Sequence, residues 1–163
     1  MLQKWDSSLK CLPPERLVTM AATLVRPMVF TNGVFDLLHV GHVRCLELAS
    51  QQGADLIVAL NTDASARGLG KPGERPFHKL QDRARVVAAL ACVSWVTWFD
   101  EATPAALLEA LRPDVYVKGG DYREDSLPET PQVRGWGGRV AIVPLVAGHS
   151  STRLLQQMQG GAS

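Results

Sequence analysis

Short apolar segments alternate with helical patterns along the 163 residues, and this alternation predicts an α/β fold. We expect a parallel sheet that carries helices on both of its faces. Residues 56–60 (LIVAL) are continuously apolar, which is typical of a strand covered on both sides. A strand, a helix and a second strand fit into about 35 residues, the size of one βαβ unit. The length suits a single domain, and no repeat, low-complexity tract or linker divides the chain.

Apolar periodicity, turn residues and capping residues predict the individual elements. Strands are expected at residues 28–31, 56–60, 93–99, 115–117 and 140–143. Helices are expected between Pro14 and Pro27, at residues 42–52 with Gly53 as a C-terminal cap, at residues 81–91, from Pro104 to Leu111 with Thr103 as the N-cap, and from an N-cap near Ser150. Residues 64–79 are rich in glycine, proline and basic side chains, so we expect a mobile basic loop there.

The composition excludes several classes of protein. Hydrophobic residues make up 46% of the chain and charged residues 20%, with a formal net charge of +1, so no global field attracts nucleic acid. The three cysteines are widely spaced, which argues against a disulfide framework or a structural zinc site. Residues 1–10 carry no signal segment, and no apolar run approaches the length of a membrane span. We expect a cytoplasmic protein that binds neither a membrane nor nucleic acid.

Three polar segments follow predicted strands or precede a predicted helix at one edge of the sheet. They are residues 31–42, residues 118–122 and the approach to Ser150. Ligands of open α/β sheets bind beyond the carboxyl ends of the strands, so these segments are expected to form one binding site.

Residues 31–42 (TNGVFDLLHVGH) hold two histidines at a predicted strand-to-helix turn. His42 stands at the start of the helix, where free amides and the helix dipole favour a phosphate, and both imidazoles can donate hydrogen bonds. Gly33 would allow the backbone to approach a ligand closely. Two histidines could also bind zinc, but no third ligand lies at a suitable spacing, and we expect no protein-bound metal.

The other segments are compatible with phosphate binding but also with ordinary structural roles. Lys118, followed by two glycines, suits a phosphate contact, although a tight turn explains the same pattern. Ser151, Thr152 and Arg153 exceed what a simple N-cap needs. Lys71 and Arg75 belong either to a solvated loop or to a lid that closes over a triphosphate. Neither a Gly-x-x-x-x-Gly-Lys phosphate loop nor a Gly-x-Gly-x-x-Gly fingerprint is present.

Residues 32–42 (NGVFDLLHVGH) resemble the first signature of the HxGH nucleotidyltransferase superfamily, and Ser151-Thr152-Arg153 resembles its second signature. Residues 61–65 and 118–122 (KGGDY) are similar to the heptose 1-phosphate adenylyltransferase branch. The resemblance covers about residues 26 to 158. In many bacteria of this branch the activity is fused to a heptose kinase, which has no counterpart here.

The resemblance implies a Rossmann-like fold, ATP with Mg²⁺, and transfer of AMP to D-glycero-β-D-manno-heptose 1-phosphate. The products would be pyrophosphate and ADP-heptose for the inner core of lipopolysaccharide. Rival hypotheses are a cytidylyltransferase that acts on glycerol 3-phosphate or a related alcohol phosphate, and a nucleotide sensor without catalytic activity. Family members tend to self-associate, so a homo-oligomer is expected. Within the chain, we expect residues 1–25 to form an N-terminal helical extension and residues 26–163 to form the nucleotidyltransferase domain.

Each candidate residue receives a role in this hypothesis. The catalytic residues are His39, His42 and Lys118. The nucleotide-binding residues are Thr31, Asn32, Gly33, Phe35, Gly41, Ser151, Thr152 and Arg153. Substrate binding is assigned to Asp36, Asp63, Lys71, Arg75, Asp121 and Tyr122, where the three aspartates meet sugar hydroxyls or position other site residues.

Overall fold

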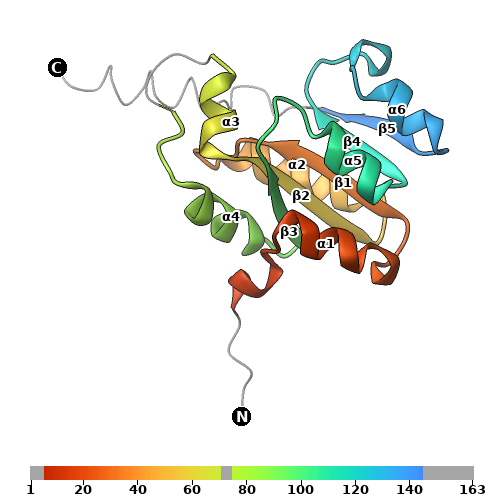
Figure 1. The fold of residues 1–163 in the computed structure, drawn as a ribbon. Coiled ribbons are helices and arrows are strands. Elements are labelled where there is room, and N and C mark those ends of the chain that lie inside the picture. The colour runs from red at the N-terminus through yellow and green to blue at the C-terminus, as the bar shows by residue number, and fades with distance from the viewer. Residues whose placement is uncertain (1–5, 71–74, 145–163) are drawn as a thin grey trace.

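A computed structural model of the chain describes residues 6–70 and 75–144. Its single sheet has five parallel strands in the order β3-β2-β1-β4-β5, which confirms the predicted α/β fold (Figure 1). The strands are β1 (Met28–Gly33), β2 (Asp55–Asn61), β3 (Trp95–Phe99), β4 (Val115–Gly119) and β5 (Arg139–Val143). The chain builds outward from β1 to β3 and then returns to start β4 on the other side of β1. This reversal opens a crevice beyond the carboxyl ends of β1 and β4.

Helices cover both faces of the sheet (Figure 1). One face carries α1 (Pro14–Met20), α5 (Ala105–Leu111) and α6 (Thr130–Gly135), and the other carries α2 (Val40–Ser50) and α4 (Leu80–Ala88). The remaining elements are α3 (Asp63–Gly68) and three 3₁₀ turns, η1 (Ser7–Lys10), η2 (Ala21–Thr23) and η3 (Glu124–Ser126). None of the helices in the described ranges combines the length and apolar character needed to cross a membrane.

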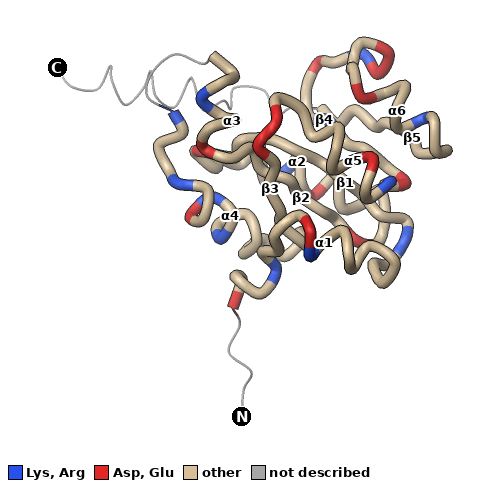
Figure 2. Tube along the Cα trace, viewed as in Figure 1, with Lys and Arg blue, Asp and Glu red and all other residues tan. Residues whose placement is uncertain are grey.

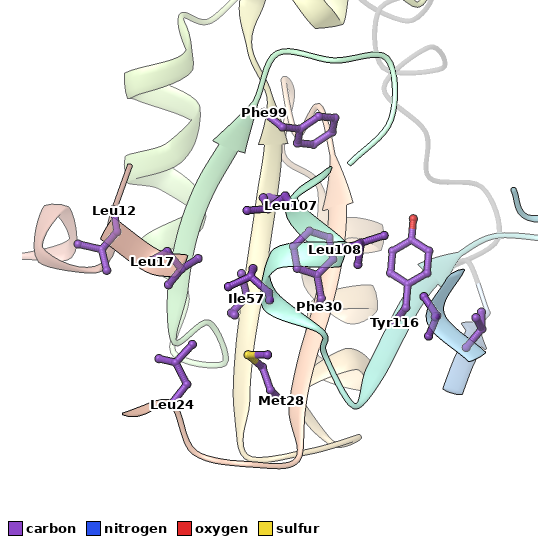
Figure 3. Packing of buried hydrophobic residues seen from close by; sticks show 14 of the residues in the cluster. Leu12, Leu17, Leu24, Met28, Phe30, Ile57, Phe99, Leu107, Leu108 and Tyr116 are labelled. Atoms are coloured by element: carbon purple, nitrogen blue, oxygen red, sulfur yellow. The ribbon is translucent and has the colours of Figure 1, made fainter. Parts of the chain in front are cut away.

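Alternate strand residues feed two separate hydrophobic cores, because successive side chains of a strand point to opposite faces. Phe30 and Tyr116 lie in the core under α1, α5 and α6, with ring centroids 6.1 Å apart. Their neighbours Val29 and Val115 lie in the core under α2 and α4. Figure 3 shows the first core, with the Tyr116 hydroxyl pointing out of it toward the carboxyl ends of the strands.

The N-terminal segment packs on this same sheet. Leu17 of α1 is fully buried, and the backbone N–H of Leu12 donates to the carbonyl of Val96 at 2.9 Å, next to a parallel bridge between Cys11 and Val96. Residues 6–25 therefore contribute to the first core. The division of the chain into an N-terminal extension at 1–25 and a domain at 26–163 stays a prediction.

Several predicted boundaries were wrong for local reasons. Residues 63–68 form α3 instead of loop, because the Thr62 hydroxyl accepts a hydrogen bond from the Ser65 amide at 3.2 Å and caps the turn. Pro104, without a side-chain cap, precedes α5 in place of the predicted N-cap Thr103. No element was predicted at η3 or α6, where polar and proline-containing sequence hides the short turns. The predicted helix from Ser150 lies outside the described residues.

Gly53 was predicted as a helix cap, but α2 ends at Ser50 with Gln51 as its C-cap. The structure requires glycine at position 53 for another reason. A Cβ atom there would lie 2.3 Å from the carbonyl oxygen of Pro27 and 2.7 Å from Cγ2 of Val29. The turn between α2 and β2 thus passes directly against the segment that enters β1.

We expect Gly53→Ala to lower the free energy of unfolding by about 2 kcal/mol or more, because the backbone must shift to relieve the clash. Gly68→Ala is the matched control, since a Cβ at Gly68 meets no atom within 4 Å. Alanine is the better helix former, so this control should be neutral or slightly stabilising. Denaturant unfolding of both variants checks the difference, and equal stabilities would contradict the tight approach at Gly53.

Candidate active site

A cleft of about 620 Å³ lies at the crevice beyond β1 and β4, within the usual size range of ligand pockets. Residues from two of the three polar segments expected there line it together. Of the predicted site residues, those that line the cleft are Thr31, Asn32, Gly33, Phe35, Asp36, His39, Gly41, His42, Arg75, Lys118 and Tyr122. Lys71, Ser151, Thr152 and Arg153 lie outside the described residues.

The two histidines stand at the N-terminus of α2, where His39 is the N-cap and His42 is the third helical residue. Their rings stack with centroids 3.9 Å apart and planes at 29°. The backbone N–H of His39 donates to Nδ1 of His42 at 3.4 Å. Because Nδ1 accepts, the neutral His42 ring carries its hydrogen on Nε2, which leaves a donor on the opposite side. This donor and the first-turn amides of α2 together favour an anion.

Phe35 contacts one of the two histidines and has an unusual backbone conformation. Its φ is +48°, in the left-handed region, and its ring lies 5.3 Å from the His42 ring between centroids. A Cβ on Gly33 would come within 2.9 Å of Cε2 of Phe35. We expected Gly33 to admit a ligand, and in the structure the space beside its Cα is filled by the Phe35 ring.

Asn32 joins β1 to β4 at the floor of the cleft. Its Oδ1 accepts from Nζ of Lys118 at 2.8 Å and from the hydroxyl of Tyr116 at 2.9 Å. These two donors fix the amide so that Nδ2 points away from them. Burial lowers the pKa of Lys118, and the negative charge of Glu129 partly opposes that effect. Burial also raises the pKa of the Tyr116 phenol, which therefore stays a hydrogen-bond donor.

Arg83 holds the loops around the cleft together from a position without solvent contact. Its guanidinium donates to the carbonyls of Val34 at 2.7 Å, Asn61 at 3.0 Å and His78 at 3.0 Å. The same group pairs with Asp63 at 2.5 Å, and the Arg83 side chain is 0% exposed. One side chain thus fixes the segment after β1, the end of β2 and the segment before α4.

The three predicted substrate-binding aspartates occupy different surroundings. Asp36 lines the cleft, and its carboxylate accepts the amides of Phe77 at 2.9 Å and His78 at 3.0 Å, which fits a positioning role. Asp63 pairs with Arg83, and Asp121 is exposed; neither lines the cleft. Arg75 lies at the cleft two residues before Phe77, with Cζ 5.8 Å from the phenyl centroid.

Sequence reasoning missed several residues of this site. Arg83 stands four residues before Val87 on the apolar face of α4, and a charged residue in that register is a signal of a buried polar role. Tyr116 gave no signal, since an aromatic residue in a buried strand is ordinary. Glu129 and Asn61 also line the cleft, and only the folded chain brings them there.

In residues 6–70 and 75–144, no three His, Cys, Asp or Glu side chains gather closely enough to hold a metal ion. The donors of the cleft are imidazole, ammonium, guanidinium and backbone N–H groups. These groups suit phosphate oxygens, so the arrangement can neutralise and align a polyphosphate.

A parallel sheet with an imidazole pair at a helix N-terminus and a lysine across the crevice defines a nucleotidyltransferase. The chain belongs to the cytidylyltransferase-like family, which it matches over residues 30–155. This result agrees with the resemblance of residues 32–42 to the first signature of the superfamily.

Two relatives illustrate what the chain is similar to. The chain is 55% identical over 154 residues to the D-beta-D-heptose 1-phosphate adenylyltransferase of Bordetella bronchiseptica, covering 93% of this chain and 95% of that protein. It is also 55% identical over 131 residues to the bifunctional protein HldE of Magnetococcus marinus, covering 80% of this chain. The chain spans 27% of that longer protein.

Solved structures show the same fold. The lipopolysaccharide core biosynthesis protein from Thermoplasma volcanium is 26% identical, with a TM-score of 0.61 over 73% of this chain and 95% of that one. Pantothenate synthetase from Thermus thermophilus is 14% identical, with a TM-score of 0.58 over 90% of this chain and 70% of that one. The second likeness concerns the fold alone.

We expect Arg83→Met to lower the free energy of unfolding by about 3 kcal/mol or more, because it leaves three carbonyls and the Asp63 carboxylate without their donor. Arg85→Met is the matched control on the same helix, since Arg85 is exposed and pairs with Asp6 only at 3.4 Å. Exposed pairs contribute little, so the control should retain nearly full stability. Thermal and denaturant unfolding check both variants, and an undiminished stability of Arg83→Met would refute this role.

Proposed function

We propose that this chain transfers AMP from ATP to D-glycero-β-D-manno-heptose 1-phosphate and releases pyrophosphate. The product, ADP-heptose, would supply the inner core of lipopolysaccharide. The nucleotidyl transfer rests on the histidine pair at the N-terminus of α2 facing Lys118 across the cleft. The choice of acceptor rests on the 55% identity to a heptose 1-phosphate adenylyltransferase of nearly the same length.

The reaction joins an oxygen of the sugar phosphate to the α-phosphorus of ATP. As this bond forms, the bond from the α-phosphorus to the bridging oxygen breaks, and the electron pair leaves with pyrophosphate. The nucleophile is already an anion, so the reaction needs no general base. Catalysis then depends on aligning the two phosphates and neutralising the charge that develops between them.

The described residues supply this neutralisation in a defined arrangement. His42 would donate from Nε2 and His39 from the N-cap position, beside the positive end of α2. Lys118, held by Asn32, would meet phosphate at the reacting centre from the β4 side. Basic and acidic residues are interspersed over the rest of the described chain (Figure 2). The cations of the cleft therefore act locally.

Further parts of the proposal rest on the sequence. Ser151, Thr152 and Arg153 would hold the β- and γ-phosphates, and Lys71 with Arg75 would close over them. Mg²⁺ would arrive with ATP, bound chiefly by phosphate oxygens and water. Tyr122 lines the cleft and is a candidate for the sugar, while direct sugar contacts by Asp63 and Asp121 stay predictions. A cytoplasmic location and a homo-oligomer also stay predictions.

The substrate assignment is tested by pyrophosphate release from the purified protein in the presence of Mg²⁺. The assay pairs ATP or CTP with heptose 1-phosphate or glycerol 3-phosphate. We expect turnover with ATP and heptose 1-phosphate. Turnover confined to CTP and glycerol 3-phosphate would establish the cytidylyltransferase alternative. Binding of ATP without turnover of any pair would identify a nucleotide sensor.

We expect His42→Ala to reduce kcat by about 10²-fold or more, the scale of losing one transition-state hydrogen-bond donor. His78→Ala is the control, because His78 is exposed, lies outside this cleft and contributes only backbone groups to the contacts described. Steady-state kinetics on folded protein compares the two variants. A His42→Ala enzyme with wild-type kcat would remove His42 from the catalytic machinery.

A further inference from the structure

Glu129 is a buried carboxylate in the wall of the cleft with no part in the phosphate contacts described above. It immediately precedes α6, it is 5% exposed, and it lines the cleft. Within the described part of the chain, Oε2 of Glu129 has no hydrogen-bond partner although it is shielded from solvent. Such an oxygen is costly to bury, because it has exchanged water for no other donor.

The nearby cation does not satisfy this carboxylate. Lys118 is close enough for the charge of Glu129 to raise its pKa. However, Nζ of Lys118 donates to Asn32, and Oε2 of Glu129 accepts no hydrogen bond from Lys118 in the described part of the chain. The Tyr116 hydroxyl likewise donates to Asn32. Both groups donate to Asn32 of β1, and neither gives a hydrogen to Oε2 of Glu129, a residue that lines the cleft.

A carboxylate and a phosphate do not share a subsite, since both are anionic hydrogen-bond acceptors. The imidazoles, Lys118 and Arg75 are donors and suit phosphate oxygens. Glu129 accepts, and an ionised carboxylate can only accept, so its complement in a ligand is a hydroxyl or amine hydrogen. A sugar phosphate carries both kinds of group: an anionic phosphate for the cations and hydroxyl donors for the carboxylate.

We infer that Glu129 accepts a hydrogen bond from a hydroxyl of the sugar phosphate and is a specificity-determining residue of the acceptor subsite. The inference rests on the proposed function, which requires the sugar to lie beside the reacting phosphates. It places the sugar on the α6 side of the cleft, next to Lys118, and the nucleotide phosphates on the α2 side. The buried oxygen gains its partner only when the acceptor binds.

The test compares Glu129→Gln and Glu129→Ala with wild type, using ATP, heptose 1-phosphate and analogues of that sugar that each lack one hydroxyl. We expect Glu129→Ala to lower kcat/KM for the sugar phosphate about tenfold or more, the scale of one hydrogen bond to a charged group, and Glu129→Gln to lower it less. The KM for ATP should change less than twofold. One analogue should lose a similar factor with wild type but nothing further with Glu129→Ala.

Glu124→Gln is the matched control, because Glu124 lies on η3 nearby but pairs with Arg134 and does not line the cleft. It should leave both KM values unchanged. Thermal unfolding without ligand separates binding from structure, since replacing an unpartnered buried carboxylate by glutamine should not lower Tm. A lowered Tm with parallel changes in both KM values would overturn the inference, as would analogues that all respond to Glu129→Ala as the parent sugar does.

Wild-type turnover of ATP with heptose 1-phosphate is measured first. Its absence would overturn the proposed function and the inference together. Turnover that is insensitive to Glu129 would overturn the inference alone and leave the proposed function standing.

Discussion

The geometry of the cleft depends on one buried guanidinium. Arg83 donates to carbonyls of Val34, Asn61 and His78, which belong to three segments far apart in the sequence, and Asp63 balances its charge. A planar group with five donors can meet several acceptors in fixed directions, which an ammonium group cannot reproduce. Arg83 joins the backbone oxygen of Val34, just after β1, to that of Asn61, at the end of β2. With Arg83 between them, the turn that presents the histidines and the segment that presents Arg75 share one anchor.

The sequence was sufficient for the fold class because burial on both faces of a parallel sheet leaves a pattern that local reasoning can detect. All five predicted strands are present, and each helix of the described ranges that showed clear periodicity was found within a few residues of its predicted position. The failures share a cause. Residues 63–68 and 130–135 form short helices whose stability comes from a cap or from packing on the sheet, so glycine, proline and polar residues concealed them.

The sequence predicted those site residues whose chemistry is evident from residue type and position at a strand end. It did not predict the roles that depend on contacts between distant segments. Residues 31–42 and 118 showed their chemistry through residue type and position at strand ends. Other features appear only in the folded chain. The Phe35 ring fills the space beside Gly33, and Asn32 accepts hydrogen bonds from two donors at once. Glu129 reaches the cleft from the residue before α6. The cleft is therefore asymmetric in a way that composition does not reveal. Most of its charged groups are donors suited to phosphate, and the buried carboxylate of Glu129 is an acceptor among them.

The backbone contact between residues 11–12 and Val96 covers part of the outer edge of β3. β3 is an outer strand of the sheet and includes Trp95, Val96 and Trp98, a sequence well suited to adding a further strand. The Leu12 amide donates to the Val96 carbonyl on this edge, and α1 begins two residues further on, at Pro14. The N-terminal segment thus covers this edge of the sheet at Val96, where a strand from another molecule could otherwise add to β3.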